Sequence, residues 1–132
     1  MAAMATVRHH VIVAASPDDA WALLGDPSRL AEWFPGVVGC QVDGAVRTVT
    51  LATGLVMTEE IVTVDALQRR LQYSIRLPMV RTHLSSIDVL DVDVHRCCCS
   101  YAADAEPSVM ALVVGGAAAD GLARAKRILE GG

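Results

Sequence analysis

Six consecutive β-rich runs, followed by one long run of small residues, constrain the fold of this chain more than any other feature. The six runs are VVGCQVDG, AVRTVTLATG, LVMTEEIVTVDA, RRLQYSIRLP, THLSSIDVLDVDVH and RCCCSYAADA, separated by Gly, Pro, Asp or charged turns. Residues of this kind favour strands, and connections this short favour hairpins between neighbouring strands. We therefore expect residues 37–105 to form an antiparallel meander.

The residues before the meander predict one strand and two short helices. Residues 7–14 have strand character, and Ser16 and Pro17 then form a helix-start signal, because Ser caps a helix and Pro suits its first position. This helix should end near Gly25, and a second helix, PSRLAEWF, should stop at Pro35.

The C-terminal residues 108–130 predict one long helix, capped by Ser108 after Pro107. At ~1.5 Å per residue it would be about 35 Å long. Its middle, VVGGAAADG, consists almost entirely of small residues, although Gly is a poor helix former. Either these residues let the helix lie close to a sheet, or they leave volume free for a ligand. Because the chain has only five aromatic residues with which to fill its interior, we favour the cavity.

The order of one strand, two helices, six strands and one helix is typical of the α+β class, with a helix against one face of an antiparallel sheet. At 132 residues the chain should form a single domain, residues 1–132. No run approaches the ~20 apolar residues of a membrane span, and the N-terminus lacks the apolar segment of a signal peptide. We expect a cytoplasmic protein without membrane insertion. The net charge of −4 and scattered basic residues argue against a nucleic-acid partner.

The cysteine triplet Cys97, Cys98 and Cys99 raises the question of a metal or redox site. In a strand, successive side chains point to opposite faces, so the three thiols cannot converge on one metal as CxxC turns do. We interpret them as reduced packing residues, with Cys97 and Cys99 also candidates for lining a cavity. His9 and His10 are adjacent in a strand and face opposite sides, which argues against joint binding of a metal ion. No metal and no cofactor are expected.

Glu59 and Glu60 open a predicted strand, so one of them should point inward. A buried ionised carboxylate needs a partner, for which Arg47 and His83 are candidates. The alternative, in which both glutamates reach solvent, stays open. His83 begins a mixed polar and apolar strand face of the kind that lines a cavity, and a Glu59/His83 pair could transfer protons as catalytic acid and base.

The chain resembles the START/Bet v 1-like (SRPBCC) superfamily, particularly its polyketide cyclase/dehydrase and lipid-transport branch. The resemblance rests on VRTVTL with a Gly turn, a Glu pair opening the next strand, an Asp ending that strand, and the RxLxYSI pattern. It implies a helix-grip fold of order β-α-α-β6-α, in which a curved seven-stranded antiparallel sheet wraps the long C-terminal helix. It also implies a cavity between the sheet and the helix.

The same runs are similar to the plant abscisic acid receptors of that superfamily, which implies further site residues. The loop Thr53-Gly54-Leu55 matches the receptors' gate loop, while Val38 replaces their ligand-binding lysine, so abscisic acid itself is not expected. Together with the residue analysis, the resemblance implies these ligand-binding positions: Leu55, Met57, Glu59, Tyr73, Val80, His83, Ser85, Ile87, Leu112, Gly116 and Asp120.

Three hypotheses follow. The first is a carrier or sensor that binds a small, largely hydrophobic molecule such as a polyketide, lipid or sterol-like compound. The second is a cyclase or dehydratase in which Glu59 and His83 act as acid and base. The third is an interaction module with a filled cavity, whose surface of Trp33-Phe34-Pro35 and the gate loop docks a partner or a second copy to form a homodimer.

Overall fold

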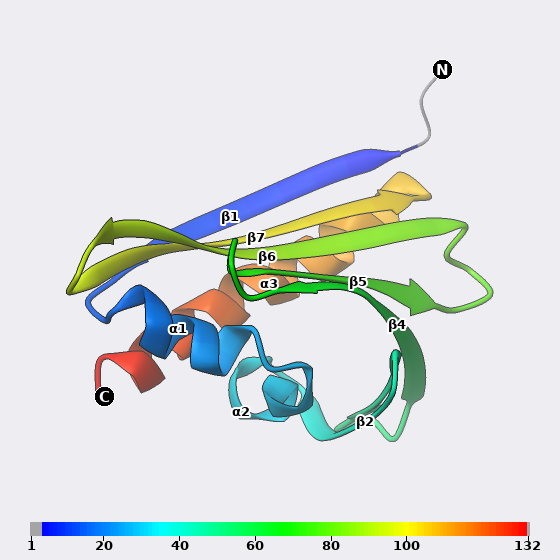
Figure 1. Ribbon diagram of the computed structural model, residues 1–132. Helices are drawn as coiled ribbons and strands as arrows, with labels where there is room; N and C mark the ends of the chain where they lie inside the picture. The colour runs from blue at the N-terminus through cyan, green and yellow to red at the C-terminus, as the bar shows by residue number, and fades with distance from the viewer. Residues whose placement is uncertain (1–3, 132) are drawn as a thin grey trace.

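The computed structural model, which describes residues 4–131, is a curved seven-stranded antiparallel sheet packed against one long helix (Figure 1). The elements are β1 (Ala5–Val13), α1 (Pro17–Leu24), the 3₁₀ turn η1 (Pro27–Arg29), α2 (Leu30–Trp33), β2 (Val37–Asp43), β3 (Val46–Leu51), β4 (Val56–Asp65), β5 (Arg70–Arg76), β6 (Thr82–Asp93), β7 (Arg96–Glu106) and α3 (Ser108–Leu129). This confirms the helix-grip fold of the α+β class.

The sheet has the strand order β1-β7-β6-β5-β4-β3-β2. Strands β2 to β7 pair with their sequence neighbours, which confirms the expected meander. The first strand returns to pair with the last one, from Ala5 opposite Ala105 to Val13 opposite Cys97. Figure 1 shows the sheet curling so that β2 and β4 come round toward α2.

Local signals in the sequence explain where the short helices begin. The Ser16 hydroxyl accepts a hydrogen bond from the Asp19 amide at 3.1 Å, as expected of an N-cap. The second predicted helix is divided into η1 and α2, and Asp26 caps the 3₁₀ turn by accepting from both the amide and the hydroxyl of Ser28. A single helix was therefore an oversimplification of this segment.

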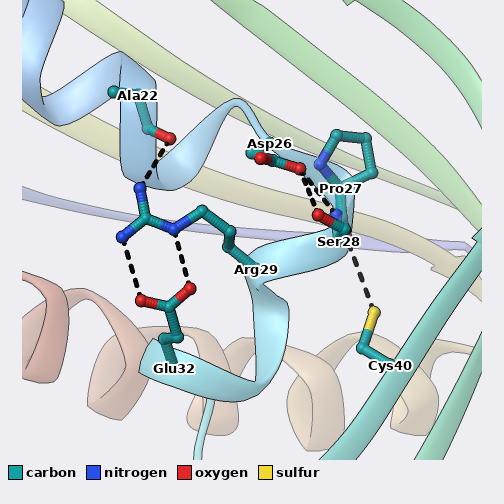
Figure 2. A network of polar contacts seen from close by, with 7 residues as sticks. All are labelled: Ala22, Asp26, Pro27, Ser28, Arg29, Glu32 and Cys40. Atoms are coloured by element: carbon teal, nitrogen blue, oxygen red, sulfur yellow. Dashed lines mark hydrogen bonds and ion pairs between the residues drawn. The ribbon is translucent and has the colours of Figure 1, made fainter.

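A polar network holds this segment against α1 and β2 (Figure 2). The Arg29 guanidinium donates to both carboxylate oxygens of Glu32, at 2.7 and 2.9 Å, and to the Ala22 carbonyl at 3.1 Å. The Pro27 carbonyl accepts from the Cys40 thiol at 3.3 Å, which joins η1 to β2. These contacts connect the segment of η1 and α2 to α1 and, through Pro27, to the sheet.

The long helix α3 covers the concave face of the sheet and packs against β1 and β7. Its first residue is Ser108, and the cap position is Pro107, which makes no side-chain cap bond. The expected capping by Ser108 is therefore wrong, because that residue already belongs to the helix. A Cβ on Gly115 would lie 2.6 Å from Cγ1 of Val7, so at this position the small residue serves close packing.

By length and composition alone, α3 could cross a membrane. The expectation concerned a continuous apolar run, and Asp120 interrupts the apolar residues of α3. In the folded chain its buried stripe faces the sheet, and it is the core helix of the domain. The residues of this stripe are Ala111, Val114, Gly115, Ala118, Gly121, Leu122 and Ala125.

Candidate functional site

A cavity of about 440 Å³ lies between the sheet, α2 and the first half of α3. Its wall is almost entirely apolar, and its volume is within the range of small-molecule sites. The strands contribute Val37, Val49, Leu51, Met57, Glu59, Tyr73 and Ile75; the loops contribute Ala52, Thr53, Leu55, Leu77 and Met79; α2 and the turn after it contribute Leu30, Phe34, Pro35 and Gly36; and α3 contributes Met110, Val113, Val114 and Ala117.

Among residues 4–131, the one charged residue of the cavity wall is Glu59, whose exposed fraction is 3%. It lies directly opposite Arg47 in the pairing of β3 and β4. Nε and Nη2 of Arg47 lie 2.7 and 2.6 Å from Oε1 of Glu59. Glu60 points to the other face and forms an ion pair with Arg76. The structure thus decides that Glu59 is the inward glutamate and that Arg47, rather than His83, is its partner.

Besides Glu59, two other groups contact the guanidinium of Arg47. Nη1 donates to the Pro27 carbonyl at 3.1 Å, which ties β3 to the η1 segment drawn in Figure 2. Its central carbon lies 4.7 Å from the ring centroid of Tyr73, a cation–π distance. Arg47 has no exposed surface. It therefore orients Glu59 from behind the cavity wall.

Burial raises the pKa of the Glu59 carboxyl above its ordinary value, and the charge and hydrogen bond of Arg47 oppose that shift. The cause of the increase is the loss of hydration, which disfavours the charged form. Only Oε1 of Glu59 takes part in hydrogen bonds among residues 4–131. One carboxylate oxygen therefore remains available to a molecule in the cavity.

Tyr73 forms the other polar part of the deep wall. Its hydroxyl shares a hydrogen bond with that of Tyr101, and burial raises the pKa of Tyr73 to about 12. Both hydroxyls are therefore neutral at physiological pH. Because a neutral hydroxyl forms weaker hydrogen bonds than a charged carboxylate, this pair is a weaker candidate for holding a ligand than Glu59.

His83 is buried but does not line this cavity. Its Nδ1 accepts a hydrogen bond from the Ile75 amide at 2.8 Å, so Nε2 carries the proton and donates to the Ser85 hydroxyl, also at 2.8 Å. Burial lowers the pKa of His83 to about 4. No hydrogen bond joins His83 to Glu59 in the described chain, so the expected acid–base pair is not assembled.

The other expected site residues divide into two groups. Leu55, Met57, Glu59 and Tyr73 line the cavity together. The remaining positions do not line it: Val80 and His83 border a separate hollow of about 510 Å³ beside the β5–β6 loop, Ser85 and Ile87 are fully buried, and Leu112, Gly116 and Asp120 lie on the exposed side of α3.

The three helix positions implied by the resemblance lie outside this cavity wall because of the way α3 is rotated about its axis. The packing of Gly115 against Val7 turns Leu112 and Gly116 toward solvent, and Leu112 is 66% exposed. The cavity is lined instead by Met110, Val113, Val114 and Ala117. These positions have the i, i+3, i+4, i+7 spacing of one helix face, so helical periodicity alone could have identified them.

Two further expectations can be compared with the structure. Cys97 and Cys99 are 0% and 1% exposed within the apolar core, which confirms the packing interpretation and places neither in the cavity wall. Within the surface that the interaction hypothesis names, Trp33 is buried at 1% exposure, whereas Leu55 of the gate loop is 49% exposed. Among residues 4–131, no group of three or more His, Cys, Asp or Glu side chains is placed to hold a metal ion.

Comparisons with known proteins agree with this architecture. A family model described as polyketide cyclase / dehydrase and lipid transport matches residues 4–130. No curated protein matches the sequence. The solved structure of the protein XoxI from Bacillus cereus superposes with a TM-score of 0.88 at 21% identity, covering 95% of this chain and 95% of that one.

Two other solved structures share the fold. A START superfamily protein from Mycobacterium smegmatis has a TM-score of 0.74 at 17% identity, covering 96% of this chain and 94% of the other. Norcoclaurine synthase from Thalictrum flavum, in complex with dopamine and hydroxybenzaldehyde, has a TM-score of 0.71 at 20% identity, with coverages of 96% and 87%. At these identities the similarity shows the fold alone.

Proposed function

The chain belongs to the polyketide cyclase/dehydrase and lipid transport family, and on that premise we propose that it is a carrier or sensor for a small, largely hydrophobic molecule. A polyketide, a lipid or a sterol-like compound fits this description. The molecule would occupy the cavity between the sheet and α3. The observation that carries the proposal is an apolar cavity of about 440 Å³ with a single carboxylate, Glu59, in its wall.

Burial of apolar surface supplies the affinity in this proposal. Each square ångström of apolar surface removed from water contributes about 25 cal/mol to the free energy of binding. A mostly apolar wall forms few hydrogen bonds to water, so water competes little with the ligand. Polar groups in such a site orient the ligand more than they hold it. Glu59 therefore determines which end of the molecule points inward, while Phe34, Val113 and their neighbours contact its apolar part.

Native mass spectrometry of the protein purified from its own host tests the proposal. We expect a bound small molecule in the wild type, which solvent extraction then identifies. Replacing Ala117 by Phe should fill the cavity and remove the bound mass, because Ala117 lines the wall. The matched control is Ala123→Phe, since Ala123 is exposed on the same helix, and this variant should keep the ligand.

A wild-type protein without bound mass, and without thermal shift across a panel of lipids and polyketides, would overturn the binding proposal. It would favour an interaction module instead. A cytoplasmic location, which the sequence leads us to expect, and a homodimer, which belongs to the interaction hypothesis, are further proposals. Size-exclusion chromatography with light scattering tests the dimer.

A cyclase or dehydratase is the second candidate, and the free oxygen of Glu59 is the observation that favours it. A carboxylate in an apolar cavity can remove a proton from the carbon next to a carbonyl group. In a dehydration, that C–H bond and the neighbouring C–O bond break, a C=C bond forms and water leaves. We expect Glu59→Gln to abolish loss of water from a β-hydroxy thioester while binding persists. Equal turnover by this variant and the wild type would exclude Glu59 as the base.

A further inference from the structure

The polar side chains of the cavity wall are few enough to limit the chemistry of the ligand. Among the described residues, they are Thr53, Glu59 and Tyr73. Thr53 belongs to an exposed loop, and the hydroxyl of Tyr73 is already bonded to that of Tyr101. Glu59 is the deep group that carries a charge, and it is therefore the stronger hydrogen-bond acceptor of the two.

The free capacity of Glu59 belongs to one atom, Oε2. Both close contacts with Arg47 use Oε1. The fully enclosed side-chain atoms without a partner in residues 4–131 are one nitrogen each of Trp33, Arg47 and Arg70, and Oε2 is not among them. Because Glu59 lines the cavity, Oε2 is the atom that a bound molecule can reach.

The positive charge that accompanies Glu59 does not reach the ligand. Arg47 donates hydrogen bonds from Nε to Glu59 and from Nη1 to the Pro27 carbonyl. Its Nη2 lies within ion-pair distance of Glu59, is fully enclosed and has no hydrogen-bond partner in residues 4–131, and Arg47 lies outside the cavity wall. The described wall contains no Lys, Arg or His. An anionic ligand would therefore bring its charge next to Glu59 without a cation to neutralise it, which is costly in an apolar site.

We propose that the polar group of the ligand is a hydrogen-bond donor without negative charge, such as an alcohol or phenol hydroxyl, and that it donates to Oε2 of Glu59. An ionised carboxylate only accepts hydrogen bonds, and bonds to a charged acceptor are stronger than neutral ones. A carboxylic acid is rejected through its charge, and an ester is bound more weakly because it has no donor. This inference rests on the proposed binding function and narrows its ligand class.

Three probes with the same chain test this selectivity: 1-decanol, methyl decanoate and decanoate. Each would displace the neutral fluorescent probe N-phenyl-1-naphthylamine from the wild-type protein at pH 7.5. We expect decanol to displace it at a concentration about tenfold or more below the concentration that the other two compounds need. This difference in affinity is the one expected from a single hydrogen bond to a charged group.

The variant Glu59→Gln sharpens the test. Its amide oxygen can stay on Arg47, which turns the NH₂ group toward the cavity as a donor. The preference for decanol should then disappear, because the NH₂ group can donate to the ester carbonyl and to the alcohol oxygen alike. Circular dichroism and binding of the fluorescent probe show whether the variant is folded; if it is not, the wild-type ranking alone decides.

The outcomes separate the two proposals. If neither the fluorescent probe nor any ten-carbon compound binds, the binding function fails and this inference fails with it. If the fluorescent probe binds but decanoate or the ester competes as well as decanol, the inference is overturned and the binding function stands. Preference for decanol in the wild type that is lost in Glu59→Gln supports both.

Discussion

Arg47 and Glu59 face each other across β3 and β4, and their closest side-chain atoms lie 2.6 Å apart with both residues buried. Such a pair is not a simple source of stability, because removing both ions from water costs about as much as their attraction returns. Its value here is positional. It orients Glu59 so that one oxygen faces the cavity.

Breaking this pair should be far more harmful than replacing it. We expect Arg47→Met to lower the free energy of unfolding by about 3–5 kcal/mol, because it leaves the Glu59 carboxylate buried and unpaired. The double variant Arg47→Met/Glu59→Leu should recover most of that loss. Urea unfolding at pH 7 measures both. A double variant as unstable as the sum of its two single variants would contradict this account.

Acid should destabilise the protein through His83. Burial lowers its folded-state pKa to about 4, below the ordinary value near 6.5. The unfolded state therefore binds the proton first, so the contribution of His83 is complete above about pH 6.5 and is lost as the pH falls toward 4. The loss is about 3 kcal/mol.

His83→Asn is the matched variant for this prediction, because its side-chain oxygen can still accept the Ile75 amide hydrogen bond. We expect urea unfolding at several pH values to show a smaller loss of stability between pH 6.5 and 4 than in the wild type. Glu59 and Asp88 also contribute to the pH dependence of the free energy of unfolding, because burial raises their pKa values. Their contributions are the same in both proteins, so the difference between the two profiles belongs to His83. Parallel pH profiles would show that His83 does not titrate on unfolding.

The adjacent glycines of α3 should respond oppositely to the same change. Gly115→Ala places a Cβ 2.6 Å from the Val7 side chain, and overpacking of this kind costs about 1–3 kcal/mol. Gly116→Ala meets no atom within 4 Å and should stabilise the helix by about 0.5–1 kcal/mol. Thermal unfolding of both variants measures the difference. Similar melting temperatures would mean that α3 does not pack on β1 as described.

The cysteines should differ in reactivity toward iodoacetamide. Cys97 and Cys99 are buried, and burial raises the pKa of both thiols, so little thiolate is present. Cys98 is partly exposed on the other face of β7. In the folded protein at pH 8, peptide mass spectrometry should find Cys98 labelled well before its two neighbours. Equal labelling of all three without denaturant would contradict their burial.

Most of the fold could be predicted because its signals are local. Turn residues and strand-forming runs identified the meander, and the Ser16 cap identified the start of α1, since each depends on a few neighbouring residues. The second helix was predicted less well. Its division into η1 and α2 depends on the bonds of Asp26 to Ser28 and of Pro27 to the strands, which short-range propensity does not contain.

The candidate site was predicted in part, for a similar reason. Alternation along β4 left two glutamates as candidates, and only the register that pairs Glu59 with Arg47 decided between them. His83 and Tyr73 were both expected in the wall, yet the bonds of His83 to Ile75 and Ser85 hold it elsewhere. Partners far apart in the chain determine such positions.

By itself, the sequence determined the order of the elements, the antiparallel sheet and the presence of one long helix rich in small residues. The tertiary structure alone decided how that helix is rotated, because the contact between Gly115 and Val7 joins residues from opposite ends of the chain. That rotation places Ala117 in the cavity and Gly116 in solvent. Backbone propensity sets local structure, whereas the direction of a side chain depends on what packs against it.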